Sequence, residues 1–131
     1  MPARKESLYP PDWLRKAKRD LERVHKRLSE SDLEDAAFHL QQALEKFLKA
    51  YLLSKGWKLK RIHDLEQLLD EVVLLNGELE KFRALCQKAT GYYLLERYPF
   101  VTEPPPPEEI RTTLREAEEL AAVITQDLGS S

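Results

Sequence analysis

Apolar residues recur at spacings of three and four along most of the chain, the period of a helix that buries one face. From about residue 11 to 28 this pattern forms one narrow stripe, with Lys and Arg on the other faces. Pro10 and Pro11 precede Asp12, and a first helical turn tolerates proline, so we expect a helix to begin here. The stripe consists of Leu14, Ala17, Leu21, Val24 and Leu28.

A second and wider apolar stripe follows, which indicates a central helix with several neighbours. Ser31 and Glu34 have the spacing of a capping box at its start. Gly56 is expected to end it, since glycine adopts the left-handed conformation of a C-cap. The stripe contains Leu33, Ala36, Ala37, Leu40, Ala43, Leu44, Phe47, Leu48, Tyr51 and Leu52.

Three more helices are predicted in the second half. The third runs from about residue 63 to 75 and stops at Asn76-Gly77. The fourth starts near residue 79 and fades before Pro99. A stiff proline run at 104–107 then leads into a last helix, whose first turn is acidic.

The fold class that follows is all-α: an up-and-down antiparallel bundle of about five helices, with no strand of useful length. We interpret residues 1–10 as an N-terminal tail and 11–131 as a single domain, which is long enough to bury a core.

Composition narrows the classes of function. The net charge is -2, so there is no global basic field to hold nucleic acid. The single cysteine, Cys86, excludes an intramolecular disulfide and suits a reducing cytoplasm. It falls on an apolar face, so we expect a buried thiol. No apolar run approaches the length of a membrane span, and we expect a cytoplasmic protein without membrane contact.

Three segments occur in an order typical of one family. They are AAFHLQQALEKFLKAYLLSKG at 36–56, HDLEQLL at 63–69, and the tyrosine pair followed by Arg-Tyr-Pro at 92–99. With them the chain resembles the HEPN domain (higher eukaryotes and prokaryotes nucleotide-binding) over roughly residues 12–128. The resemblance implies a helical bundle that forms a homodimer, a small nucleotidyltransferase partner, and nucleotide or RNA binding.

Many HEPN proteins are metal-independent ribonucleases, with an arginine followed after four to six residues by a histidine late in the domain. Here Arg97 is followed by no histidine. The pair Arg19 and His25 has that spacing, but it lies in the first helix, where residues six apart do not share a face. The resemblance is therefore to the branch without the nuclease pair, and we assign no catalytic residue.

His63 and Asp64 form the first candidate site. A histidine at a helix N-terminus can donate to a phosphate, and the positive end of the helix adds attraction. Alternatively, either residue caps the helix or bonds to a neighbour. Lys49 and Gln42 are seven residues apart on the second helix, so they share a face that is either a polar groove or solvent-exposed.

Tyr93, Arg97 and Tyr98 form the second candidate. Arginine binds phosphate oxygens through two donors, and tyrosine offers a face on which a base can stack. Alternatively, Tyr93 packs in the core and Arg97 pairs with a nearby acid. Tyr98 precedes a proline and is expected to be extended.

The remaining polar residues give weaker indications of a functional site. A basic connector surrounds Trp57 and either tracks a phosphate backbone or is simply solvated. His39 lies beside the apolar stripe and is expected to be a hydrogen-bonded packing residue. No metal-ligand spacing is present, and we predict no cofactor. The cations of the connector are Lys55, Lys58, Lys60 and Arg61.

We therefore predict a HEPN-domain protein that acts as a non-catalytic nucleotide-binding or partner-binding module. Its expected setting is a toxin-antitoxin-like system with a nucleotidyltransferase partner. One alternative is a metal-independent ribonuclease toxin with a displaced site, formed by Arg97 and His63. The other is a protein-interaction adaptor.

Overall fold

A computed structural model describes residues 7–98 and 103–129, and its secondary structure is helical throughout. Three long helices and four shorter segments follow one another along the chain. They are α1 (Pro10–Ser29), α2 (Leu33–Ser54), α3 (Leu65–Leu75), the 3-10 segment η1 (Gly77–Phe82), α4 (Arg83–Thr90), α5 (Tyr93–Arg97) and α6 (Pro107–Gly129).

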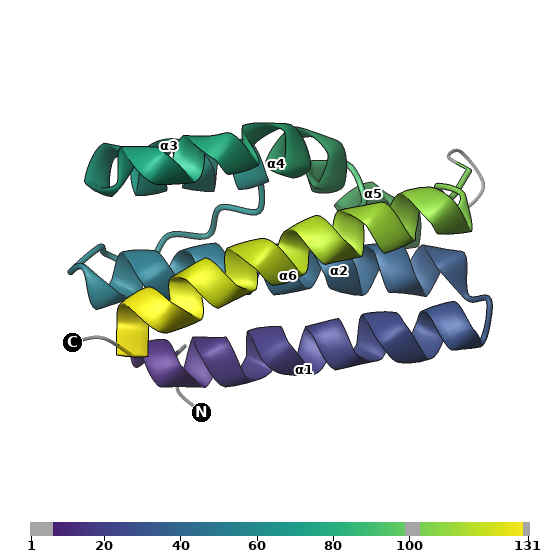
Figure 1. Ribbon diagram of the computed structural model, residues 1–131, viewed down its shortest axis with the longest axis horizontal. Coiled ribbons are helices and arrows are strands. Elements are labelled where there is room, and N and C mark those ends of the chain that lie inside the picture. Colours follow the sequence, from purple (N-terminus) through teal and green to yellow (C-terminus); the bar gives the residue numbers. More distant parts are fainter. Residues whose placement is uncertain (1–6, 99–102, 130–131) are drawn as a thin grey trace, which may run out of the picture.

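The helices form an up-and-down bundle around α2. Figure 1 shows α1 and α2 running antiparallel, α6 crossing them diagonally, and α3 with α4 on the far side of α2 from α1. The described ends of the chain, at α1 and α6, lie at the same end of the molecule. The all-α bundle predicted from the apolar period is confirmed.

Helix α2 is central because its apolar residues surround it on several sides. Its Phe47, Leu40, Leu44 and Leu48 are fully buried. The helix buries residues against α1, α3, α5 and α6, as its wide stripe predicts. This position lets α2 carry polar side chains that contact both α1 and the connector before α3.

The start of α2 differs from the prediction. Ser31 adopts a left-handed backbone with φ 59°, so it belongs to the turn and does not cap the helix. The N-cap is Asp32, whose side chain accepts a hydrogen bond from the backbone N–H of Asp35. The predicted capping box of Ser31 and Glu34 is therefore wrong. Gly56, with φ 89°, follows the end of the helix as predicted.

The fourth predicted helix is divided into η1, α4 and α5. Asn76 leaves α3 in an extended conformation, and its side chain caps η1 through the N–H of Glu78. A turn at Gly91 separates α4 from α5. Cys86 of α4 is fully buried, as predicted. Within residues 7–98 and 103–129, no helix is both long enough and apolar enough to cross a membrane.

Candidate functional site

A buried carboxylate on α2, that of Glu45, joins three polar side chains. Its Oε2 accepts a hydrogen bond from Lys49 Nζ at 3.0 Å, and its Oε1 lies 3.0 Å from His63 Nδ1. Gln41 Nε2 also donates to Oε1, at 3.2 Å. The Glu45 and Lys49 side chains are only 7% and 5% exposed, so solvent screens this cluster weakly. The charges balance because one ammonium meets one carboxylate.

His63 is held in one orientation at the edge of this cluster. A carboxylate oxygen only accepts hydrogen bonds, so the Nδ1 that faces Glu45 carries the proton. The imidazole also stacks on Tyr93 of α5, with ring centroids 5.1 Å apart and planes 10° apart. The side chain is 52% exposed, and Nε2 has no hydrogen-bond partner within the described part of the chain. His63 therefore presents Nε2 as its available nitrogen.

The backbone around His63 is fixed from two sides. Gln41 Nε2 donates to the carbonyl oxygen of His63 at 3.1 Å, which ties the connector to α2. Gln42 in turn donates to Gln41 Oε1 at 2.7 Å. The N–H of Leu65 donates to Thr90 Oγ1, so the start of α3 is tied to the end of α4. Helices far apart in sequence thus hold the imidazole in place.

Lys49 does not face open solvent. Besides its bond to Glu45, its ammonium lies 5.7 Å from the ring centroid of Trp13 on α1. Its role in the free protein is therefore to hold the Glu45 carboxylate, which in turn holds His63. Gln42 lies seven residues, or two helical turns, before Lys49. The two residues therefore belong to the same face of α2, as the spacing predicts.

Asp64 caps α3. Its Oδ1 accepts hydrogen bonds from the N–H groups of Glu66 at 2.9 Å and Gln67 at 3.4 Å. Tyr98, the C-cap of α5, leaves the helix with φ -131° and ψ 62°, and it is 53% exposed. Arg97 is the last residue of α5. Its side chain lies outside the described part of the structure.

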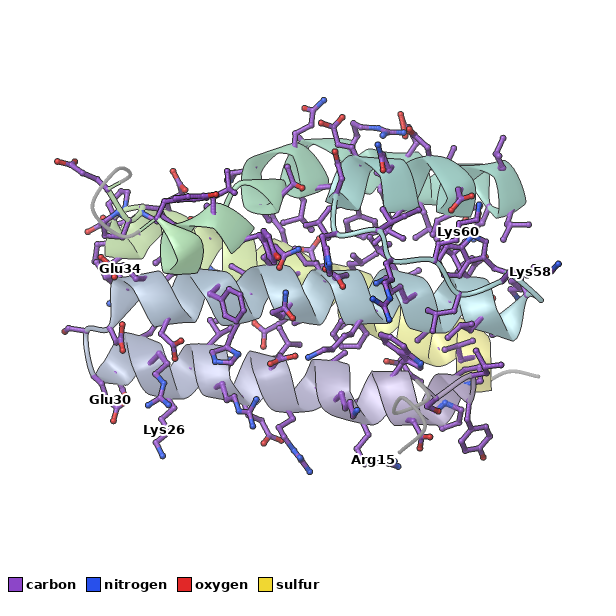
Figure 2. The ribbon with its side chains drawn as sticks, turned by 180° about the vertical axis from the view of Figure 1, so that it is seen from behind. Arg15, Lys26, Glu30, Glu34, Lys58 and Lys60 are labelled. Atoms are coloured by element: carbon purple, nitrogen blue, oxygen red, sulfur yellow. The ribbon has the colours of Figure 1, made fainter. Side chains whose placement is uncertain are left out.

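The basic connector is partly neutralised. Lys60 Nζ and Trp57 Nε1 both donate to the carboxylate of Glu71, and Lys55 pairs with Asp127 at 3.2 Å. Figure 2 shows Lys58 and Lys60 at one end of the bundle, on the connector side of α2. These contacts favour a structural role for this run over a continuous track for phosphates.

A second polar cluster joins α1 to α2. Asp20, only 1% exposed, faces His39 Nδ1 at 2.9 Å and Lys46 Nζ at 2.5 Å. Burial would raise the pKa of Asp20, but hydrogen bonds from His39 and Lys46 outweigh it, and the net pKa is lowered. His39 also lies 3.4 Å from Asp35 Oδ2. It is a hydrogen-bonded packing residue, as predicted.

The structure thus brings three of the six predicted site residues together: Lys49, His63 and Tyr93. Glu45, whose carboxylate connects Lys49 to His63, was not among the residues predicted from the sequence. The signal for Glu45 was present, because Gln41, Glu45 and Lys49 follow one another at intervals of four, on one helix face. A buried carboxylate that orients an exposed imidazole can position a proton donor or acceptor toward a ligand. No group of three metal-ligating side chains occurs among the residues described.

The fold and this site define an all-α bundle whose central helix supports a histidine at the start of a shorter helix. A sequence model described as the HEPN domain matches residues 11–127. The chain belongs to the HEPN family.

Two solved structures are similar to it. TT1696 from Thermus thermophilus has a TM-score of 0.75 and 25% identity, over 89% of this chain and 96% of that one. ST0689, described as an archaeal HEPN homologue, has a TM-score of 0.71 and 24% identity, over 91% of this chain and 97% of that one. The second likeness concerns the fold alone. No curated protein matches this chain.

Proposed function

We propose that this HEPN protein is a non-catalytic module that binds a nucleotide through its phosphate at His63. The observation that carries the proposal is the fixed imidazole, whose Nδ1 is held by Glu45 and whose ring is supported by Tyr93. In the imidazolium form both ring nitrogens carry a proton, so Nδ1–H stays on Glu45 while Nε2–H donates to a phosphate oxygen. The N-terminus of α3 begins two residues further on.

We also propose which tyrosine would stack on the base. One face of the Tyr93 ring is occupied by the imidazole, so Tyr93 supports His63 in this arrangement. Tyr98, more than half exposed, lies at the end of the same short helix. We infer that Tyr98 contributes the stacking face and that Arg97, next to it in sequence, binds phosphate.

Calorimetric titration with AMP, GMP, ATP and GTP tests this proposal. His63→Gln should weaken binding by roughly tenfold, the effect of losing one charge-assisted hydrogen bond. The matched control is Lys58→Gln, which removes one exposed cation from the same connector and should leave binding nearly unchanged. If none of the four nucleotides binds the folded wild type at millimolar concentration, the proposal fails.

We also propose a homodimer. Two large apolar side chains on and beside α5, Leu94 and Tyr98, are 47% and 53% exposed next to the candidate site. Large exposed apolar side chains are typical of an interface. Light scattering should give twice the chain mass for wild type, and Leu94→Glu should shift it to a monomer. The control Leu74→Glu changes an 86% exposed leucine at the end of α3 and should leave the dimer intact. A monomeric wild type contradicts the proposal.

A toxin-antitoxin-like pairing with a small nucleotidyltransferase, in the cytoplasm, is part of the same proposal. Family membership supports it. Co-expression with the product of the neighbouring reading frame tests it, with co-purification at a fixed stoichiometry as the expected result. A neighbour that is no nucleotidyltransferase, or one that does not co-purify, overturns the pairing.

A second candidate function, metal-independent RNA cleavage, is favoured by one observation. The buried Glu45 orients His63 as a carboxylate orients a catalytic histidine, with the second ring nitrogen available for proton transfer. Incubation of single-stranded RNA with wild type and with His63→Ala distinguishes this candidate. Cleavage by wild type alone supports it, and equal background cleavage by both excludes it.

A further inference from the structure

On the other side of the molecule, a pocket of about 390 Å³ lies between α1 and α6. It is separate from the His63 site, which α2, the connector and α5 form. Leu28 and Leu114 give it an apolar surface, and Arg111 and Arg115 line it from α6. A volume of this size accommodates a small ligand.

The two arginines are placed for joint binding of one anion. They are four residues apart on α6, so their side chains leave the same face of the helix about 6 Å apart. Both are exposed, and neither forms an ion pair with any residue in the described ranges. Most other arginines of α1 and α4 do pair with acids, as Arg27 and Arg83 show. Arg111 and Arg115 are therefore available to an external anion.

The opposite wall of the pocket carries a histidine paired with an acid. His25 of α1 lines the pocket, and its Nε2 lies 3.3 Å from Glu118 Oε2 of α6. This pair connects the two helices across the pocket and places the Glu118 carboxylate against the imidazole. Since Glu118 is the one acid among the lining residues, the two guanidinium groups outnumber it.

Helix α1 also favours the approach of an anion. It carries seven Lys and Arg against three Asp and Glu, although the whole chain is net negative. Long-range attraction of this kind raises the rate at which a charged ligand arrives. The chemistry of the pocket matches a phosphoryl group, because two guanidinium forks bind its oxygens in pairs.

We propose that the α1–α6 pocket binds a phosphate monoester, with the phosphoryl group on Arg111 and Arg115 and the organic group against Leu28 and Leu114. The contact with the leucines distinguishes an organic phosphate from free inorganic phosphate. This site is independent of the nucleotide site proposed at His63.

The test is an NMR titration of the full chain with two probes, phenyl phosphate and inorganic phosphate. Both should shift the amide signals of residues 25–29 and 111–118. Phenyl phosphate should bind about fivefold more tightly, because its ring buries apolar surface. The double variant Arg111→Gln/Arg115→Gln should weaken phenyl phosphate by roughly tenfold or more.

Three controls keep the result specific. Arg19→Gln/Lys26→Gln removes two exposed cations of α1 that have no ion pair among the described residues, and it should retain wild-type affinity. Arg115→Lys keeps the charge without the fork and should lose only part of the affinity. His63→Gln changes the other proposed phosphate site, so the shifts of residues 25–29 and 111–118 should keep their wild-type titration curves.

Equal weakening by the α1 control would show that general charge attraction explains binding, and it would overturn the proposal. Loss of phenyl phosphate binding in His63→Gln, with wild-type affinity in the α6 double variant, would assign the phosphate to the other site. No shift at residues 25–29 or 111–118 would also refute the pocket. Because the substituted residues of α1 and α6 are exposed, an unchanged melting temperature is expected for the variants of these two helices.

Discussion

Asp20 of α1 and Lys46 of α2 form an ion pair between the two helices, with 2.5 Å between Oδ2 and Nζ. His39 of α2 holds the other oxygen of the same carboxylate at 2.9 Å. These two partners come from α2, two turns apart, and Arg23 of α1 lies 3.6 Å from Oδ1 as well. The contacts with His39 and Lys46 connect one side chain of α1 to two points along α2 and so favour one axial register of the two helices. This buried acid and the ion pair of Arg27 with Asp35 both connect α1 to α2 and help to align the two helices.

Asp20→Ala should lower the free energy of unfolding by about 3 kcal/mol, because the partly buried ammonium of Lys46 and imidazole of His39 lose their partner. The matched control is Asp12→Ala on the same helix, whose pair with Arg15 is exposed to solvent and should therefore cost clearly less. Urea denaturation measures both. A cost for Asp20→Ala no larger than that of Asp12→Ala would contradict the assigned role.

The same carboxylate gives a pH dependence with a definite sign. The folded-state pKa of Asp20 lies below its ordinary value of 3.8, so folding favours the ionised form. The resulting stability is present above pH 3.8 and is lost as pH falls through the lower folded value. The stability difference between wild type and Asp20→Asn should be constant near neutral pH and shrink in strong acid. Denaturation at a series of pH values checks this, and a difference that does not change with pH would refute it.

Two variants of Asp64 distinguish a role as helix cap from a role in ligand binding. Asp64→Ala removes the acceptor for two N–H groups of α3 and should cost about 1 kcal/mol, whereas Asp64→Asn keeps an acceptor and should cost a few tenths. Thermal melting measures the difference. If Asp64 serves only as the cap, Asp64→Asn should bind nucleotides like wild type. A large loss of nucleotide binding in this well-folded variant would instead place Asp64 at the ligand.

Cys86 should be inert in the folded protein. It is fully buried on α4, and burial raises the pKa of its thiol to about 12. A thiol reagent at neutral pH should therefore react only after denaturation, at a rate set by unfolding. Rapid modification of the native protein would show that α4 opens locally on the time scale of the reaction.

The apolar period was enough to predict the bundle, because every long helix here buries a stripe that its sequence displays. The same period was not enough to predict where each helix begins and ends. Ser31 and Asp32 are both good capping residues, and tertiary geometry decided between them by placing Ser31 in a left-handed turn. The predicted fourth helix has an unbroken apolar pattern, yet it begins as the 3-10 segment η1, and a turn at Gly91 divides the remainder into α4 and α5.

The candidate site was predictable only in part, because its residues meet through tertiary contacts. His63 and Tyr93 lie thirty positions apart, and no spacing rule indicates that their rings stack. Glu45 and Lys49 were visible as a pair on one helix face, but an i,i+4 ion pair is usually exposed. Here the wide apolar surroundings of α2 bury it, and burial converts a common surface pair into a support for the imidazole.

The position of the proton on the His63 ring offers the most direct test of whether Glu45 orients the imidazole. Since Nδ1 faces the Glu45 carboxylate, the neutral ring should carry its proton on Nδ1. His25 is an internal comparison, because it faces Glu118 through Nε2 and should favour the opposite tautomer. Nitrogen-15 shifts of the two rings in mildly alkaline solution distinguish these forms. In Glu45→Gln the side chain can donate as well as accept, so the preference of His63 should relax while that of His25 stays. Identical tautomers for His63 and His25 in wild type would show that Glu45 does not orient the imidazole in solution.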